Sequence, residues 1–189
     1  MTTKVYFIRH AKPDISVKED MIRPLSFEGM EKSKELVKLF SEIKIDLIYS
    51  SPYKRSIQTI EPIAENKGMI IEIINNFRER KMSDNWIDNF NEFSKNQWND
   101  FSYKLIDGES LIETQNRNIE ELNKILLKNK GKTILIGTHG TALSTIINYY
   151  DNTFKYENFM KIVDIMPYIM KIEFNNNEYV RREEIKLIK

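Results

Sequence analysis

The chain contains only two histidines, and each follows a short apolar run. His10 comes after residues 5–8 (VYFI), and His139 comes after residues 133–137 (TILIG). Apolar runs with β-branched and aromatic residues are typical of buried strands. In open α/β sheets, ligands bind beyond the carboxyl ends of the strands, and an imidazole can serve there as a nucleophile or an acid–base group. The two histidines therefore predict a catalytic site at one edge of a sheet.

Three charged residues stand in equivalent places. Arg9 lies between the first apolar run and its histidine. Arg55 follows the apolar stretch 46–49, and Glu79 follows the stretch 69–74. If these strands are parallel, all their carboxyl ends face the same way and the side chains converge. Two guanidinium groups and two imidazoles would form a compact cationic pocket. Such a pocket suits a phosphoryl group, because arginine binds its oxygens bidentately.

This pocket can be compared with what phosphomonoester hydrolysis requires. A catalyst needs a nucleophile in line with the leaving group, cations on the phosphoryl oxygens and an acid for the leaving alkoxide. The sequence has no cysteine and no evident carboxylate-rich metal motif, so histidine is the available covalent nucleophile. Glu79 is the candidate acid, with Asp84 and Glu109 as rivals. The basic residues within 78–81 either bind a second anionic group or are exposed solubilising charges.

The starts of two helices are expected to add polar groups to the pocket. Ser51 is predicted to cap a helix that has Pro52 at its first position, and a second helix begins after Thr138. Both N-termini would supply N–H donors and the positive end of a helix dipole. Pro62 is expected to kink or end the first of these helices.

Strands and helices alternate along the chain. A capping box at Ser110 and Glu113 marks the start of one amphipathic helix, and residues 168–174 and 178–185 form a predicted hairpin. This order predicts an α/β fold in three layers. A mostly parallel central sheet carries helices on both faces and has an antiparallel C-terminal edge.

No repeat, linker or low-complexity tract divides the chain, so residues 1–189 are expected to form a single domain. The irregular stretch at about 78–108 is predicted to form a small cap-like insertion over the site. Its two tryptophans, Trp86 and Trp98, are expected to pack within the cap rather than to stack on a substrate.

Composition narrows the classes of partner. Hydrophobic content of 41% and charged content of 30% are typical of a globular protein. The net charge of +1 provides no electrostatic footprint for nucleic acid or a membrane surface. Residues 133–150 carry no charge, but their glycines, histidine and asparagine favour strand, turn and buried helix over a membrane span. Arg9 interrupts the N-terminal apolar run too early for a signal peptide, so a cytoplasmic location is expected. The oligomeric state is left open.

Taken together, these pieces resemble the motifs of the histidine phosphatase (phosphoglycerate mutase-like) superfamily. They occur in that family's order and span nearly the whole chain: FIRHA at 7–11, LSFEG at 25–29, SSPYKRSIQT at 50–59, FRE at 77–79, GES at 108–110 and GTHG at 137–140. A single Arg-His pair is weak evidence. An ordered set of motifs that includes both histidines is strong evidence.

The resemblance implies a role for each matching residue. His10 would be the phosphorylated nucleophile. Glu79 would be the proton donor and then the base that activates water. Arg9, Arg55 and His139 would bind the phosphoryl group. The resemblance implies no metal and no cofactor.

Two positions depart from the family's usual pattern. The family most often has Gly after the motif histidine, where this chain has Ala11, a variant found in some branches. Many members carry Asn seven residues past the motif arginine, where this chain has Ser16. Ser16 is expected to make a weaker phosphate contact or none. These departures bear on affinity and subfamily more than on the chemical step.

The favoured function is hydrolysis of a small phosphorylated metabolite through a phosphohistidine. One alternative is phosphoglycerate mutase-type transfer, which is less favoured because mutases of the family generally run longer. Another is a catalytically silent module that binds a phosphorylated ligand. For catalysis His10 must be neutral, and the neighbouring arginines are expected to lower its pKa. An acidic to near-neutral pH optimum is therefore expected.

Overall fold

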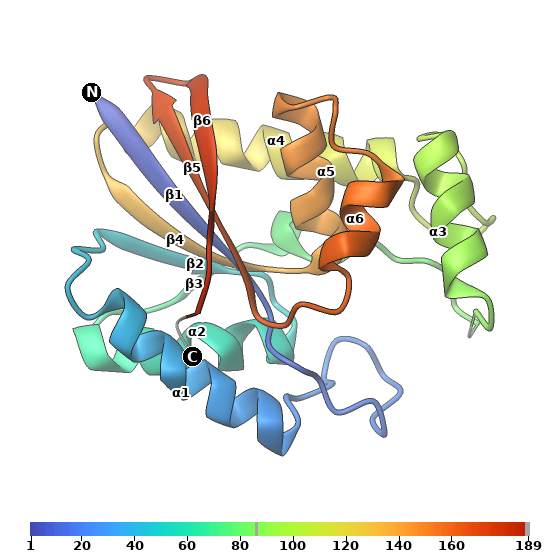
Figure 1. Ribbon diagram of the computed structural model, residues 1–189, viewed down its shortest axis with the longest axis horizontal. Coiled ribbons are helices and arrows are strands. Elements are labelled where there is room, and N and C mark those ends of the chain that lie inside the picture. Colours follow the sequence, from blue (N-terminus) through green and yellow to red (C-terminus); the bar gives the residue numbers. More distant parts are fainter. Residues whose placement is uncertain (86, 188–189) are drawn as a thin grey trace.

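A six-stranded sheet forms the centre of the computed structural model, which describes residues 1–85 and 87–187 (Figure 1). Its strand order is β3-β2-β4-β1-β5-β6. The four strands from β3 to β1 are parallel, whereas β5 pairs antiparallel with β1, and β6 antiparallel with β5. The predicted mostly parallel sheet with an antiparallel C-terminal edge is thus confirmed. The bounds are β1 (Thr2–Arg9), β2 (Leu47–Ser50), β3 (Glu72–Ile73), β4 (Thr133–Thr138), β5 (Tyr168–Asn175) and β6 (Glu178–Ile185).

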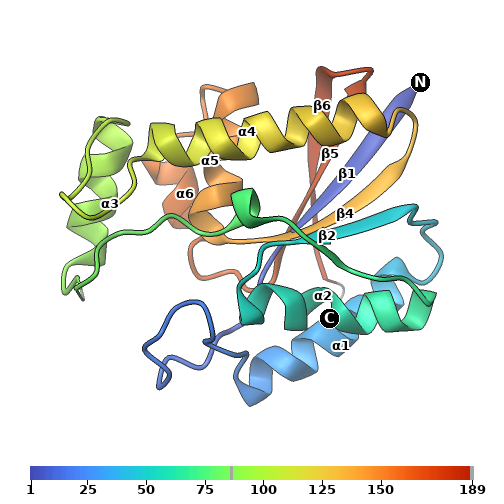
Figure 2. The same ribbon diagram turned by 180° about the vertical axis from the view of Figure 1, so that it is seen from behind.

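Helices cover both faces of the sheet, as Figures 1 and 2 show from opposite sides. On one face lie α1 (Phe27–Phe40) and α2 (Lys54–Lys67). On the other lie α4 (Leu111–Lys128), which starts with the predicted Ser110/Glu113 capping box, and α5 (Gly140–Tyr150). Smaller elements complete the fold: the 3-10 helix η1 (Asn75–Phe77), α3 (Phe90–Asn99) and α6 (Tyr156–Ile162). Within the described ranges no helix has both the length and the apolar character that a membrane span needs.

The residues of β1 show how one short run builds two cores. Val5 and Phe7 are fully buried in the cluster that also contains the apolar faces of α4 and α5. Tyr6 and Ile8 are buried in the opposite cluster, with residues of α1 and α2. Successive strand side chains point to opposite faces. The part of β1 that helices cover on both sides, residues 5–8, is therefore apolar at each position.

Three expectations about local structure are wrong. Helix α2 starts at Lys54 with Tyr53 as its N-cap; the hydroxyl of Ser51, the predicted cap, is engaged elsewhere. For Pro62 only the expected end of the helix is wrong, because α2 continues to its C-cap at Gly68. Buried neighbours on that helix, among them Ile63, outweigh a cost of roughly 3 kcal/mol for an internal proline. The stretch at residues 69–74 was expected to form the third strand, but β3 covers only Glu72–Ile73. These are the two positions at which it pairs with β2.

The segment between η1 and α4 carries α3, which lies outside the sheet beside α6 (Figure 1). Trp98 of α3 is buried among aromatic rings and stacks on Phe159 of α6 at a centroid distance of 5.6 Å. Trp98 is thus a packing residue as predicted, although it packs against Phe154 and Phe159 outside residues 78–108 as well as against Phe101 within them. Trp86 lies outside the described residues. A cap function for residues 78–108 stays a prediction.

Candidate active site

The carboxyl ends of β1 and β4 bring the two histidines together. Arg9 is in register with Thr138, and the His10 N–H donates to the Thr138 carbonyl at 3.0 Å. The next residue along each strand end is a histidine, and the ring centroids of His10 and His139 are 5.3 Å apart. The expected meeting of the imidazoles is therefore confirmed.

His10 is held with one ring nitrogen free for chemistry. Its Nδ1 lies 2.8 Å from the carbonyl oxygen of Ala11. A carbonyl can only accept, so Nδ1 carries the hydrogen and the neutral ring has its lone pair on Nε2. Burial lowers the pKa of His10 well below its usual value of 6.5, and Arg55 and Arg9 lower it further. His10 is thus neutral at neutral pH, as nucleophilic attack requires.

His139 is completely buried and anchored by Ser51. Its Nε2 lies 2.6 Å from the Ser51 hydroxyl oxygen, which also accepts the Tyr53 N–H at 3.2 Å. Burial, and then Arg55 and His10, lower the pKa of His139 well below 6.5. Ser51 was not expected to be a site residue, although it lies within the SSPYKR motif. Because Ser51 stands directly before Pro52, its sequence context is that of a helix N-cap and not that of a site residue.

The guanidinium of Arg55 is 4% exposed and is bound by the loop at residues 12–24. Its Nη1 donates to the Asp20 carbonyl at 2.6 Å and lies 3.1 Å from the Asp20 carboxylate. Arg23 donates to the same carboxylate at 2.7 Å. Asp20 and Arg23 were not identified from the sequence. Both residues lie in the irregular loop that follows β1.

The LSFEG motif fastens this loop to α1. The Ser26 N–H donates to the Lys12 carbonyl at 2.9 Å. A Cβ at Gly29 would lie 2.2 Å from the same carbonyl oxygen, far inside van der Waals contact. Glycine at this position therefore lets the loop approach the helix, next to the chain that carries His10.

Arg9 reaches from β1 to the end of α6. Its Nη1 donates to the carbonyls of Ile162 at 2.8 Å and Ile165 at 3.3 Å. Its Nε has no hydrogen-bond partner among the described residues. Burial lowers the pKa of Arg9 to about 10, opposed by the charge of Glu79, so the group is cationic at neutral pH. The Nη1 of Arg9 therefore binds the protein, whereas its Nε is unpartnered beside the histidines.

Glu79 binds the first turn of α5 with its carboxylate. Oε2 accepts the Thr141 N–H at 2.9 Å, and Oε1 accepts the N–H groups of Ala142 at 3.0 Å and Arg80 at 2.9 Å. The predicted N–H donors of this helix are therefore used by Glu79 at Thr141 and Ala142. Oε2 accepts one bond among the described residues and has a second lone pair that can carry a proton.

Other residues singled out from the sequence lie apart from the imidazoles. The Ser16 hydroxyl is exposed and donates to Asp14 at 2.7 Å. Asp84 pairs with Lys81 on the surface at 2.7 Å. Glu109 pairs with Arg78 and Arg117. Among the described residues, none of these three side chains makes a hydrogen bond to His10 or His139.

The basic residues beside Glu79 differ in their environments. Arg80 is buried, donates to the Thr141 hydroxyl and lies over the ring of Phe93 at 5.7 Å, so it is not a solubilising surface charge. Lys81 is exposed. Within residues 1–85 and 87–187 no group of three or more His, Asp or Glu side chains is arranged to hold a metal ion.

Comparison with known protein families gives one match that covers most of the chain. The family model for the histidine phosphatase superfamily (branch 1) matches residues 5–180. No curated protein matches the sequence significantly.

Solved structures with the same fold include three that cover nearly the whole chain. YhfR from Bacillus stearothermophilus is 22% identical over 94% of each chain, with a TM-score of 0.78. A mycobacterial glucosyl-3-phosphoglycerate phosphatase is 14% identical over 97% of each chain, with a TM-score of 0.76. A mutant phosphoserine phosphatase from Entamoeba histolytica, in complex with phosphoserine, is 20% identical over 94% of each chain, with a TM-score of 0.75. At these identities the likeness is one of fold.

Proposed function

Because the chain belongs to the histidine phosphatase superfamily, we propose that it is a phosphatase that hydrolyses small phosphomonoesters through a phosphohistidine on His10. One observation carries the proposal. Nδ1 of His10 is tied to the Ala11 carbonyl, so a neutral ring presents the Nε2 lone pair beside the cations of Arg9 and Arg55. That is the state and the setting that attack on phosphorus requires.

In the first proposed step, the Nε2 lone pair of His10 forms a bond to phosphorus as the ester P–O bond breaks. Glu79, starting protonated, transfers its proton to the leaving oxygen, so the alcohol leaves neutral. Arg9, Arg55 and His139 stabilise the charge on the phosphoryl oxygens. Ser16 adds a weaker contact if its loop turns inward.

In the second proposed step, water attacks the phosphohistidine. Glu79 is now a carboxylate and takes a proton from the water as the new P–O bond forms. The N–P bond breaks, the electron pair returns to Nε2, and inorganic phosphate leaves. The two steps restore His10 and Glu79 and consume one water. They need no cofactor, because the protein's own groups supply the nucleophile, the cations and the acid.

The proposed substrate is a small phosphorylated metabolite. The fold neighbours named as phosphatases act, by their names, on glucosyl-3-phosphoglycerate and on phosphoserine. Residues 77–108 and the loop at 12–24 are the parts of this chain that would contact the remainder of such a substrate. The buried Arg80 beside Glu79 is one charged group in that region.

The test is rapid-quench kinetics with p-nitrophenyl phosphate. A burst of p-nitrophenol and an acid-labile phosphoenzyme are expected, and both are expected to vanish in His10→Ala. Assay of 3-phosphoglycerate is expected to yield free phosphate; an isomeric phosphoglycerate would instead favour a mutase. Tight phosphate binding without turnover of any ester would overturn the proposal in favour of a silent binding module.

A further inference from the structure

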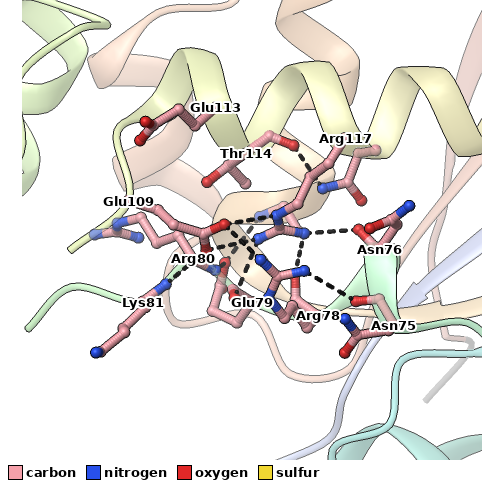
Figure 3. A network of polar contacts seen from close by, with 12 residues as sticks. Asn75, Asn76, Arg78, Glu79, Arg80, Lys81, Glu109, Glu113, Thr114 and Arg117 are labelled. Carbon is pink, nitrogen blue, oxygen red and sulfur yellow. Dashed lines mark hydrogen bonds and ion pairs between the residues drawn. The ribbon is translucent and has the colours of Figure 1, made fainter. Parts of the chain in front are cut away.

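The segment that carries Glu79 is held by an arginine from a distant helix. Arg117 lies in the middle of α4 and faces residues 76–79, as Figure 3 shows. Its Nη1 donates to the carbonyl oxygens of Asn76 at 2.6 Å and Arg78 at 2.9 Å. Its Nη2 donates to the carbonyl oxygen of Glu79 at 3.2 Å. One guanidinium thus binds three carbonyls in four consecutive residues.

The same guanidinium is fixed from its other side by Glu109. Nε and Nη2 of Arg117 donate to the two oxygens of this carboxylate at 2.9 and 3.1 Å. Glu109 also accepts from Arg78 at 2.7 Å and from the Lys81 N–H at 3.0 Å. Burial alone would raise the pKa of Glu109, but hydrogen bonds from Arg117 and the nearby positive charges hold it below its usual value. Glu109 is therefore an anion at neutral pH.

The hydrogen bonds from Arg117 hold residues 76–79, a segment that lies beyond the last strand pairing of β3. Strand β3 ends at Ile73, and the chain then crosses from the sheet to α3 beneath α4 (Figure 2). The carbonyls of Arg78 and Glu79 belong to consecutive peptide groups on either side of the Glu79 Cα. When both are bound by one planar, rigid fork, the direction in which the Glu79 side chain leaves the backbone is set.

We propose that Arg117 is a positioning residue for Glu79: it aims the carboxyl group at the leaving oxygen through the backbone carbonyls of residues 76, 78 and 79. The inference rests on the proposed function, in which Glu79 is the proton donor. The side chain of Glu79 is bound at its far end by the N–H groups of Thr141 and Ala142. With Arg117 on the backbone, it is fixed at both ends, and proton transfer depends on such placement.

The proposal has a chemical signature that general damage to the fold lacks. Protonation of the leaving group matters for an alkyl phosphate, whose alkoxide is a poor leaving group, and hardly at all for 2,4-dinitrophenyl phosphate. The ratio kcat/KM reports only the steps up to formation of the phosphohistidine. Displacement of Glu79 should therefore lower kcat/KM selectively for the alkyl ester.

The test uses Arg117→Lys, which keeps a positive charge opposite Glu109 but replaces the fork with a single point of contact. With glycerol 2-phosphate, kcat/KM is expected to fall about 10- to 100-fold. With 2,4-dinitrophenyl phosphate, a change of less than about threefold is expected. The matched control is Arg181→Lys. Arg181 on β6 makes the same bidentate pair with Glu173 on β5, and Arg181→Lys is expected to leave both ratios unchanged.

A double-mutant cycle with Glu79→Gln completes the test. If Arg117 acts through Glu79, then Arg117→Lys in the Glu79→Gln background causes no further loss with glycerol 2-phosphate. Equal losses for the two esters, or losses that add in the double variant, would overturn the inference. Thermal unfolding of each variant checks that the fold is retained, and Arg117→Gln provides a second variant if Arg117→Lys is unfolded. Failure of the proposed function has a different outcome, because the wild-type protein would then turn over neither ester through His10.

Discussion

The imidazole rings of His10 and His139 meet edge to face at an interplanar angle of 61°, and both are at least nine-tenths buried. Burial lowers the pKa of each ring, and the positive charge of Arg55 lowers both pKa values further. Protonation of either ring would place another cation in a site that already holds the guanidinium groups of Arg9 and Arg55. The pair therefore favours two neutral imidazoles, which has consequences for stability and for catalysis.

Stability should fall as the pH falls below about 6.5. Both histidines have a lowered pKa in the folded protein, so below 6.5 the unfolded chain binds more protons and is favoured. The slope is at most about 1.4 kcal/mol per pH unit for each histidine. The measurement is the difference in Tm between pH 7.5 and pH 5. This difference should shrink in His10→Asn and in His139→Asn, and an unchanged difference in both variants would contradict the prediction.

The pH profile of kcat/KM should extend to acidic values. Since the pKa of His10 is lowered, the proposed nucleophile stays neutral below pH 6.5, while the proposed acid, Glu79, needs its proton. We expect an acidic to near-neutral optimum with glycerol 2-phosphate. The measurement is kcat/KM from pH 4.5 to 9.5. A rate that climbs steeply above pH 9 would be incompatible with a protonated carboxyl group as the acid.

Removal of the charge on Asp20 should strengthen the binding of phosphate. The Asp20 carboxylate lies 3.1 Å from Arg55, so it competes with a phosphoryl group for that cation and repels its charge. In Asp20→Asn we expect the inhibition constant of inorganic phosphate to fall by about 5- to 10-fold. The control is Asp46→Asn, which removes a carboxylate before the amino end of β2 and should leave the constant unchanged. An unchanged or weaker affinity in Asp20→Asn would refute this competition.

Loss of the Ser51 hydroxyl should release His139. In Ser51→Ala the Nε2 atom of His139 loses its partner at 2.6 Å, and the ring is no longer held in one orientation. We expect kcat/KM to fall about tenfold for alkyl and aryl esters alike, with a stability loss of about 1 kcal/mol. The control is Ser50→Ala, since Ser50 is also buried but bonds to Ser56. Equal effects of the two variants on kcat/KM would show that the hydroxyl of Ser51 has no special role.

Much of the framework followed from local sequence patterns. The run at residues 5–8 predicts a strand because a strand segment that is covered on both faces carries apolar side chains in succession, and residues 5–8 of β1 are such a segment. The Ser110/Glu113 pair predicts a helix start because the two residues satisfy each other's backbone groups within one turn. The convergence of the histidines also followed, since parallel strands share one carboxyl edge. All of these depend on interactions between near neighbours or on the geometry of a sheet.

The partners of the polar side chains were decided only by the tertiary structure. Ser51 was expected to cap a helix, yet it binds His139, which is 88 positions away in the chain. The N–H groups of α5 were expected to face a ligand, yet two of them bind Glu79. Arg117 stands in α4 with no local sign of its three carbonyl partners. A buried donor must find an acceptor, and packing decides which acceptor lies within 3 Å. The apolar pattern that builds the core does not specify that choice.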